Sequence, residues 1–151
     1  MEIIEYFECN QDRDWLTQIE NCDWNAAKIL SGLLQTPNKF FDVLGDNGKL
    51  FILKDADKLA AFATLTQREC IKDDSLYPWI GFVYTRPEYR GNRFSERIVE
   101  HACNVAKEQG YDRVYIATEH AGELYKKYGF VYKGNMVDVF GVENQVFYKD
   151  I

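Results

Sequence analysis

Apolar and polar residues recur along this chain with two different periods, which predict a mixture of strands and helices. Runs rich in β-branched and aromatic residues predict strands. These runs are residues 3–7, 49–54, 59–68, 77–85, 113–118 and 145–149. Apolar residues at helical spacing predict helices. These are residues 12–20, 25–34, 94–109 and 121–128. The chain is therefore expected to be an α/β protein.

The connections between these runs predict their order in a sheet. Residues 55–58, Asp-Ala-Asp-Lys, join the second and third runs closely enough for an antiparallel hairpin. Helix 94–109 separates the fourth and fifth runs and predicts a right-handed crossover between them, with Gly110 as the stop of the helix. The order β-α-α-β-β-β-α-β-α-β-β, which includes one further strand between helix 121–128 and the run 145–149, predicts a mixed sheet flanked by helices.

One domain over residues 1–151 is expected, because no repeat, linker or low-complexity segment interrupts the pattern. The chain is long enough to bury a core, and its 46 % hydrophobic and 28 % charged residues are typical of a soluble globular protein. No apolar stretch reaches the length of a membrane span, and the acidic start Met1-Glu2-Ile3 is unlike a signal peptide. These features predict a cytoplasmic location.

The net charge of −6 and the pI near 5.0 argue against nucleic-acid and anionic-membrane partners, which normally require a basic face. The cysteines are widely spaced and form no Cys-x-x-Cys pair. They are Cys9, Cys22, Cys70 and Cys103. We therefore expect reduced thiols that pack in the protein, with neither a disulfide framework nor a metal site.

The segment Tyr89-Arg90-Gly91-Asn92-Arg93-Phe94-Ser95 lies between a predicted strand and a predicted helix. The first turn of a helix has unpaired N–H groups and the positive end of the helix dipole, so this junction favours a phosphate. Arginines cluster around it in an otherwise acidic chain. They are Arg86, Arg90, Arg93 and Arg97. Scattered charge on a solvated helix face is the alternative interpretation, but the position at a strand-to-helix junction favours an anion site.

This segment resembles the phosphate loop of the GNAT superfamily of acetyl-CoA-dependent N-acyltransferases, Gln/Arg-x-x-Gly-x-Gly/Ala. Arg90 fills the first position, whereas Arg93 stands where the family usually has glycine and Ser95 where it has glycine or alanine. We interpret both as tolerated variants, with the Arg93 side chain turned outward. A second segment, Leu124-Tyr125-Lys126-Lys127-Tyr128-Gly129-Phe130, is similar to the family's Leu-Tyr-x-x-x-Gly-Phe. Two motifs in the family's order are more specific than either alone.

The resemblance implies a GNAT-like fold, a mostly antiparallel sheet flanked by helices whose middle strands splay apart. It also implies acetyl-CoA as cosubstrate, without a metal. The pantetheine arm would pair with the main chain of the strand at Val83, Tyr84 and Thr85. The diphosphate would rest on the loop and first helical turn. The residues assigned to it are Arg90, Gly91, Asn92, Arg93, Phe94 and Ser95.

The resemblance also places Tyr125 beside the thioester sulfur, where a phenol can donate a proton to the leaving thiolate. Packing of its ring is the alternative role. Glu119 and His120 are the nearest titratable pair for a general base, although a solvated loop or a helix cap explains them equally well. Glu69 and a water chain are the further alternatives for the base.

The acceptor implied by the resemblance is an amine on a small molecule or a peptide. An acidic rim would favour a cationic amine such as a polyamine, an amino sugar or a lysine side chain, and the net charge alone does not distinguish these. Aromatic residues early in the chain are candidates for its pocket wall, and core packing explains each equally well. They are Tyr6, Phe7, Trp15, Trp24, Phe40 and Phe41. The assembly state, monomer or homodimer, stays open at this point.

Two rival classes remain from the sequence. A noncatalytic acyl-CoA sensor or interaction module would keep the phosphate loop and lose the chemistry of Tyr125. A different nucleotide-binding enzyme is disfavoured, because the chain has no Gly-x-x-x-x-Gly-Lys-Ser/Thr and no Gly-x-Gly-x-x-Gly near its first strand.

Overall fold

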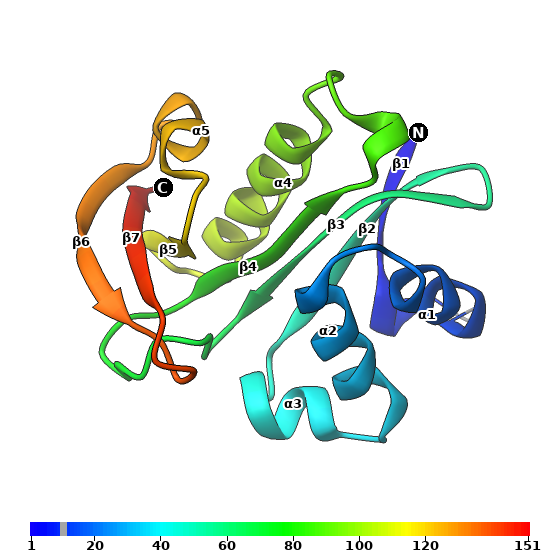
Figure 1. Ribbon diagram of the computed structural model, residues 1–151, viewed down its shortest axis with the longest axis horizontal. Coiled ribbons are helices and arrows are strands. Elements are labelled where there is room, and N and C mark those ends of the chain that lie inside the picture. Colours follow the sequence, from blue (N-terminus) through cyan, green and yellow to red (C-terminus); the bar gives the residue numbers. More distant parts are fainter. Residues whose placement is uncertain (10–11) are drawn as a thin grey trace.

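A computed structural model describes residues 1–9 and 12–151. The described residues form one seven-stranded sheet in the order β1-β2-β3-β4-β5-β7-β6 (Figure 1). The strands are β1 (Glu2–Glu5), β2 (Lys49–Asp55), β3 (Lys58–Thr66), β4 (Trp79–Thr85), β5 (Arg113–Thr118), β6 (Val131–Val137) and β7 (Glu143–Asp150). Neighbouring strands are antiparallel except β4 and β5, which are parallel. The sheet is therefore mixed and mostly antiparallel, as predicted.

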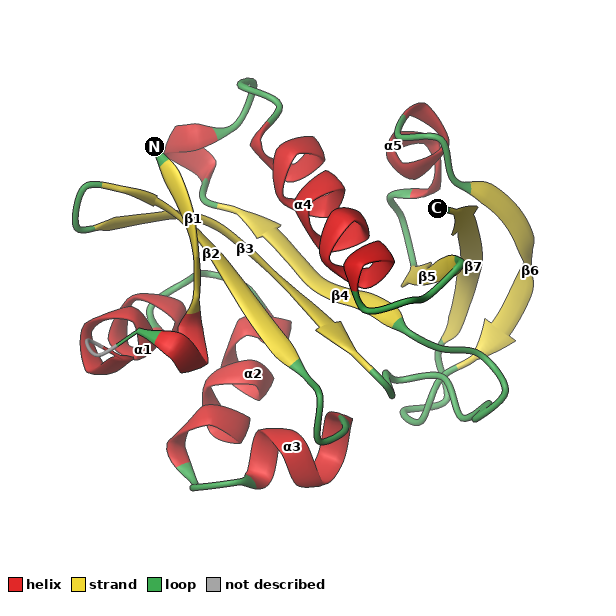
Figure 2. Ribbon diagram, turned by 180° about the vertical axis from the view of Figure 1, so that it is seen from behind, coloured by secondary structure: helices red, strands yellow, loops and turns green. Residues whose placement is uncertain are grey.

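Helices lie on both sides of this sheet (Figure 2). They are α1 (Asp12–Glu20), α2 (Asn25–Gln35), α3 (Lys39–Leu44), α4 (Phe94–Glu108) and α5 (Gly122–Lys127), with short 3₁₀ turns η1 (Tyr6–Glu8) and η2 (Pro87–Tyr89). Helix α4 connects the parallel strands β4 and β5, which confirms the predicted crossover element.

Several details of the predicted elements are corrected, including the fourth strand, which begins at Trp79 rather than at residue 77. The first strand ends at Glu5 rather than at residue 7, because Tyr6 and Phe7 enter the 3₁₀ turn. Helix α3 is absent from the prediction, since six residues are too few to establish a helical period. The third predicted strand, 59–68, ends at Thr66, where the Thr66 hydroxyl donates to the Arg68 carbonyl and turns the chain.

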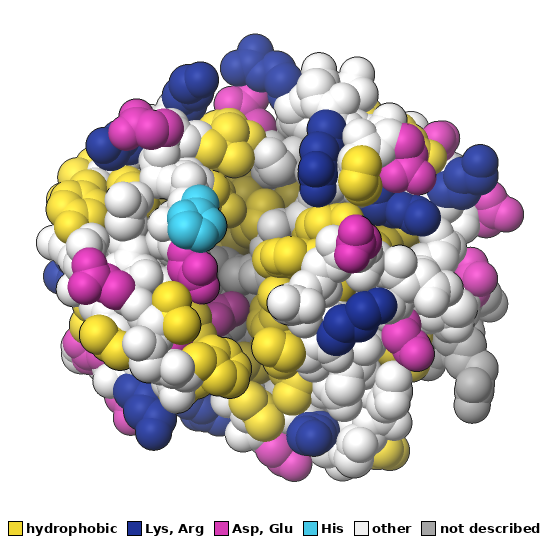
Figure 3. All heavy atoms as spheres, viewed as in Figure 1, with side chains coloured by type: hydrophobic (Ala, Val, Ile, Leu, Met, Phe, Trp, Pro, Cys, Tyr) yellow, Lys and Arg dark blue, Asp and Glu magenta, His cyan; other side chains and the backbone are white. Residues whose placement is uncertain are grey.

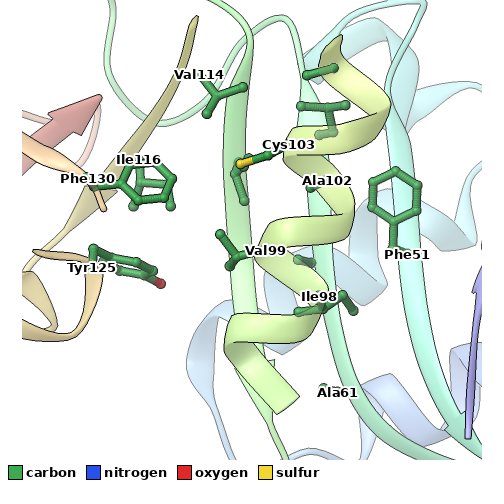
Figure 4. Close-up of a cluster of buried hydrophobic side chains, with 14 of the residues drawn as sticks. Phe51, Ala61, Ile98, Val99, Ala102, Cys103, Val114, Ile116, Tyr125 and Phe130 are labelled. Carbon is green, nitrogen blue, oxygen red and sulfur yellow. The ribbon is translucent and has the colours of Figure 1, made fainter. Parts of the chain in front are cut away.

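Two apolar layers form on opposite faces of the sheet. Along β2, Phe51 and Leu53 pack in the layer under α4, whereas Leu50 and Ile52 pack under α1 and α2, as the alternation of a strand requires. Figure 4 shows Ile98, Val99 and Cys103 of α4 among the side chains of the layer under α4. These side chains are at most 6 % exposed. Burial on both faces fixes the register of the sheet, because a slip by one residue would expose these side chains.

The middle of the sheet is irregular in two ways. Among the described residues β4 and β5 share one register pair, Trp79 with Tyr115, and then diverge. In β4, Tyr84 pairs with Phe62 but Gly81 pairs with Thr64, so β4 contains one extra residue. Phe82, with φ of 48°, lies in this bulge. A bulge bends its strand and increases the local twist, so it is suited to turning β4 away from β5.

Candidate functional site

The gap between β4 and β5 presents main chain of β4 that does not pair with β3. The N–H of Arg86 donates to the carbonyl of Ala60, which makes Ala61 and Thr85 a non-hydrogen-bonded pair. The N–H and carbonyl of Thr85 therefore face away from β3 and into the gap. Figure 3 shows that the surface is hollowed along this gap. An extended ligand lying there could pair with the edge of β4 as an added strand does.

Val83 and Tyr84 lie on the same strand with different surroundings. Val83 packs on the layer under α4. Tyr84 pairs with Phe62 of β3 and turns its ring to the opposite face, where it stacks on Trp24 with 5.1 Å between ring centroids. The main chain of Thr85 therefore lies at the gap, whereas the ring of Tyr84 belongs to the face covered by α2. Pairing of Val83, Tyr84 and Thr85 with a cosubstrate stays a prediction.

The loop between β4 and α4 turns through two residues in the left-handed region, Gly91 with φ of 84° and Arg93 with φ of 61°. Arg93 is the residue before α4, and its side chain does not cap the helix. The N–H groups of the first turn, including those of Phe94 and Ser95, are accordingly left to a ligand or solvent. With the positive end of the helix dipole, this turn is suited to hold a phosphate group.

Two arginines border this turn in different ways. The Arg93 side chain is 82 % exposed and pairs with Glu96 at 3.2 Å, so it points outward as expected. Arg90 donates from Nε to the carbonyl of Thr85 at 3.0 Å and lies over the ring of Tyr84. Dark-blue Lys and Arg side chains gather above the hollow, over the loop that precedes α4 (Figure 3). This end of the gap is therefore locally basic in an acidic protein.

Asn92 and Ser95 fix the loop by hydrogen bonds. Asn92 Nδ2 donates to the carbonyl of Tyr89 at 3.0 Å. Ser95 Oγ lies 2.6 Å from Tyr128 Oη. The serine therefore joins the first turn of α4 to the chain just after α5, across the upper end of the gap. From the sequence, Ser95 is expected only to be a small residue, and no local pattern indicates a partner 33 positions away.

Tyr125 of α5 is 6 % exposed and packs its ring near those of Tyr128 and Phe130. Figure 4 shows its hydroxyl directed toward α4. Burial, and secondarily the neighbouring Tyr128, raises the pKa of the Tyr125 phenol above its usual value of 10.0. The phenol is therefore a proton donor at neutral pH, in a setting from which water is largely excluded.

Glu119 and His120 follow β5 directly. Nε2 of His120 lies 3.4 Å from Oε2 of Glu119, and the two side chains are 91 % and 48 % exposed. Their mutual contact agrees with the pairing considered in the sequence analysis. Their exposure places them at the rim of the site, in contact with solvent.

Glu69 is half-buried against the middle of β4 instead. A side chain at Gly81 would place its Cβ 1.8 Å from Oε1 of Glu69, so the carboxylate occupies the space that the glycine leaves. Its Oε2 accepts a hydrogen bond from the N–H of Cys70 at 2.7 Å. Burial raises the pKa of the Glu69 carboxyl, and the hydrogen bond from Cys70 offsets part of this effect.

Thr64 lies beside this carboxylate on the same face of the sheet. It pairs with Gly81, and paired residues direct their side chains to one face with Cβ atoms about 5 Å apart. Thr64 is 0 % exposed, and its hydroxyl has no hydrogen-bond partner in the part of the protein that the structure describes. A buried polar atom without a partner is uncommon in a native protein. Sequence reasoning missed Thr64, because its β-branched side chain is typical of any strand.

The aromatic residues proposed for the acceptor side divide into two groups. Tyr6, Trp15 and Phe40 are buried in the core under α1 and α2. Trp24 and Phe41 are half-buried at its edge, and Phe7 is exposed. Core packing therefore accounts for the first group.

Two further findings, on metal ions and on membranes, concern residues 1–9 and 12–151. No group of three or more His, Cys, Asp and Glu side chains there could hold a metal ion. In the same residues, no helix has both the length and the apolar character needed to cross a membrane.

Comparison with known proteins gives a family match over most of the chain. The sequence model of the acetyltransferase (GNAT) family matches residues 7–130. No curated protein sequence gives a significant match. Many solved structures are similar, at identities that show the fold alone.

Three of these structures cover nearly the whole chain. An aminoglycoside 6'-N-acetyltransferase complexed with coenzyme A has a TM-score of 0.72 at 16 % identity, with 99 % of this chain and 97 % of that chain covered. The aminoglycoside 6'-N-acetyltransferase from Enterococcus faecium has a TM-score of 0.73 at 14 % identity, with 99 % and 97 % covered. An acetyltransferase from Bacillus subtilis in complex with CoA has a TM-score of 0.67 at 18 % identity, with 99 % and 98 % covered.

Proposed function

The chain belongs to the acetyltransferase (GNAT) family, and we propose that it transfers the acetyl group of acetyl-CoA to a primary amine of a small molecule or a peptide. The observation that carries the proposal is the gap between β4 and β5, which opens directly beneath the first turn of α4. The edge of a strand can bind the amide-containing arm of the cosubstrate, and the helix N-terminus that follows it can bind the diphosphate.

In this proposal the cosubstrate lies along the gap. The pantetheine amides pair with the main chain of Val83 and Thr85, and the diphosphate rests on the N–H groups from Gly91 to Ser95. Arg90 and Arg93 supply positive charge at the same end. The thioester then lies toward the middle of β4, between Tyr125 on one side and the Gly81–Phe82 segment on the other.

Transfer proceeds by direct attack of the amine nitrogen on the thioester carbonyl. A C–N bond forms and the C–S bond breaks, giving the amide and coenzyme A. The amine loses a proton to a general base, and the departing thiolate gains one from the phenol of Tyr125. The phenol of Tyr125 is protonated at neutral pH and can donate, although burial raises its pKa and makes it a weaker acid than an exposed tyrosine.

Glu69 is the general base that the geometry supports best. Its carboxylate abuts Gly81 on the face of β4 opposite α4, beside the place proposed for the thioester. Burial raises its pKa toward the working range of a base. Glu119 and His120 stay as the alternative pair, and their exposure is better suited to passing protons on to solvent than to contacting a bound amine.

A parallel titration with acetyl-CoA, ATP and NAD tests the proposal. Acetyl-CoA should bind with micromolar affinity, on the order of −8 kcal/mol, and more tightly than the other two. Release of free thiol in the presence of an amine panel then tests transfer. Binding without thiol release from any amine would favour the rival noncatalytic acyl-CoA sensor. Residues 1–151 are proposed to act as one catalytic domain in the cytoplasm.

A further inference from the structure

The hairpin between β6 and β7 exposes apolar side chains at its tip. They are Val137, Val139, Phe140 and Val142. Phe140 is 68 % exposed. Single exposed apolar residues are ordinary on a protein surface, but a group of adjacent exposed apolar residues is typical of a binding site for a ligand or another protein.

The carboxylate of Asp138 fixes the conformation of this tip. Its Oδ1 accepts hydrogen bonds from the N–H groups of Phe140 and Val142, each at 2.9 Å. Its Oδ2 accepts from Nδ2 of Asn144 at 2.9 Å. The apolar side chains are thus presented from a turn that is already ordered, which lowers the entropic cost of binding against them.

A main-chain bond places the tip beside the proposed base. The N–H of Val139 donates to the carbonyl of Cys70 at 2.9 Å, and Cys70 follows Glu69. Met136 of the same hairpin and Cys70 pack on one apolar cluster with Trp79, at the start of β4. The tip therefore borders the acceptor side of the site, on the sheet face that carries the Glu69 carboxylate and Thr64.

The polar groups of this region suit one ammonium rather than several. Of the carboxylates described above, that of Asp138 is occupied by its own turn and that of Glu119 is exposed at the rim, whereas that of Glu69 lies with the hydroxyl of Thr64 beside Gly81. Half-buried Phe82 continues the apolar surface on β4. Figure 3 shows apolar side chains on both sides of the hollow.

We propose that the acceptor is a monoamine with an apolar body. Its nitrogen lies at Glu69 and Thr64, and the body packs against Val139, Phe140 and Val142. This inference rests on the acetyl transfer proposed above and selects, within it, an apolar monoamine over a polycationic amine.

Two readouts test the inference separately from the transfer reaction. Calorimetry measures binding of 2-phenylethylamine, ethylamine, spermidine and kanamycin to the protein saturated with CoA, and thiol release from acetyl-CoA measures turnover of the same amines. We expect 2-phenylethylamine to bind and to react best. Phe140→Ser should weaken its binding about tenfold, the scale expected from losing an aromatic contact, and change ethylamine less than twofold.

Val131→Ser is the matched control, because Val131 is an exposed apolar residue at the opposite end of β6. It should leave both amines unchanged. Preference for spermidine or kanamycin, no binding of 2-phenylethylamine, or equal effects of the two variants overturns the inference. So does a Phe140→Ser variant that changes only the sedimentation behaviour, since the tip would then bind a second copy. Amine binding without thiol release overturns the transfer function instead and leaves the binding preference standing.

Discussion

Ser95 Oγ and Tyr128 Oη lie 2.6 Å apart and join two elements that the gap otherwise separates. Ser95 belongs to the first turn of α4, and Tyr128 directly follows α5. Both motifs that indicate the family meet in this contact. The small residue that the family usually has at the position of Ser95 could not form it.

The contact predicts a shared loss of stability. Ser95→Ala and Tyr128→Phe should each lower the free energy of unfolding by about 1 kcal/mol, the usual net value of a hydrogen bond. The double variant should lose little more than either single variant, because both remove the same interaction. Denaturant unfolding of the four proteins measures the coupling. Fully additive losses would show that the two hydroxyls do not interact.

Replacing Arg93 by glycine should give a more stable protein than replacing it by alanine. Its φ of 61° lies in the left-handed region, which costs a non-glycine residue about 1 kcal/mol. Arg93→Gly and Arg93→Ala both remove the exposed pair with Glu96, but only glycine relieves the backbone. The glycine variant should therefore unfold at higher denaturant concentration than the alanine variant. The reverse order would contradict the backbone assignment at this position.

The proposed role of Arg90 is to bind the diphosphate of the cosubstrate. Arg90→Ala should weaken binding of CoA more than binding of a dephosphorylated pantetheine fragment, and added salt should reduce the difference. Lys107→Ala removes one positive charge at the other end of α4 and is the control. Calorimetric titration measures both ligands. Equal losses for CoA and pantetheine would mean that Arg90 holds no phosphate.

Tyr125 predicts the chemistry of the leaving group. Tyr125→Phe should lower the turnover number about 10²-fold with little change in acetyl-CoA affinity, because packing is kept and the proton is lost. Since burial raises the pKa of this phenol, the wild-type rate should not fall through deprotonation of Tyr125 below about pH 10. A pre-steady-state measurement of thiol release checks both expectations. An unaltered rate of the chemical step would remove Tyr125 from the mechanism.

Glu69 predicts opposite effects on rate and stability. Glu69→Gln should lower the rate about 10²-fold, whereas Glu119→Gln should not. Because burial raises the folded-state pKa of Glu69, the folded protein binds this proton more tightly than the unfolded chain. Ionisation at neutral pH therefore costs stability, and Glu69→Gln should raise the free energy of unfolding there.

The gain from Glu69→Gln should disappear as the pH falls below the ordinary glutamate pKa of 4.5, where both states of the wild type are protonated. Unfolding measured across this range gives the sign directly. If Glu119→Gln or His120→Gln abolishes activity while Glu69→Gln does not, the base lies in the exposed pair instead.

The sequence predicts most of the elements because their signals are local. Strand β5 has the predicted bounds, since its β-branched run is flanked by polar residues on both sides. Helix α4 ends one residue before the predicted end, near Gly110. Helix α3 escapes prediction because it is short and begins after Asn38, whose positive φ gives no glycine signal.

The finer geometry of the site depends on contacts between distant residues. Gly81 directly precedes the bulge at Phe82, and a glycine inside a strand can mark a bulge, but it does not tell which residue is the extra one. The contact of Glu69 with Gly81 requires β3 and β4 to be paired in a particular register. Only the assembled sheet brings Thr64 beside Glu69, so a hydroxyl that is unremarkable in the sequence becomes a candidate ligand for the acceptor.

Because β4 and β5 share one register pair among the described residues, the sheet consists of two half-sheets joined at Trp79 and Tyr115. The first half-sheet is β1–β4, and the second is β5, β7 and β6. Side chains of both half-sheets pack in the same apolar layer under α4. A cosubstrate that pairs along the open edge of β4 then acts as an additional strand between the two half-sheets. Binding of CoA should hold the half-sheets together, so amide protons of the second half-sheet should exchange more slowly when CoA is bound.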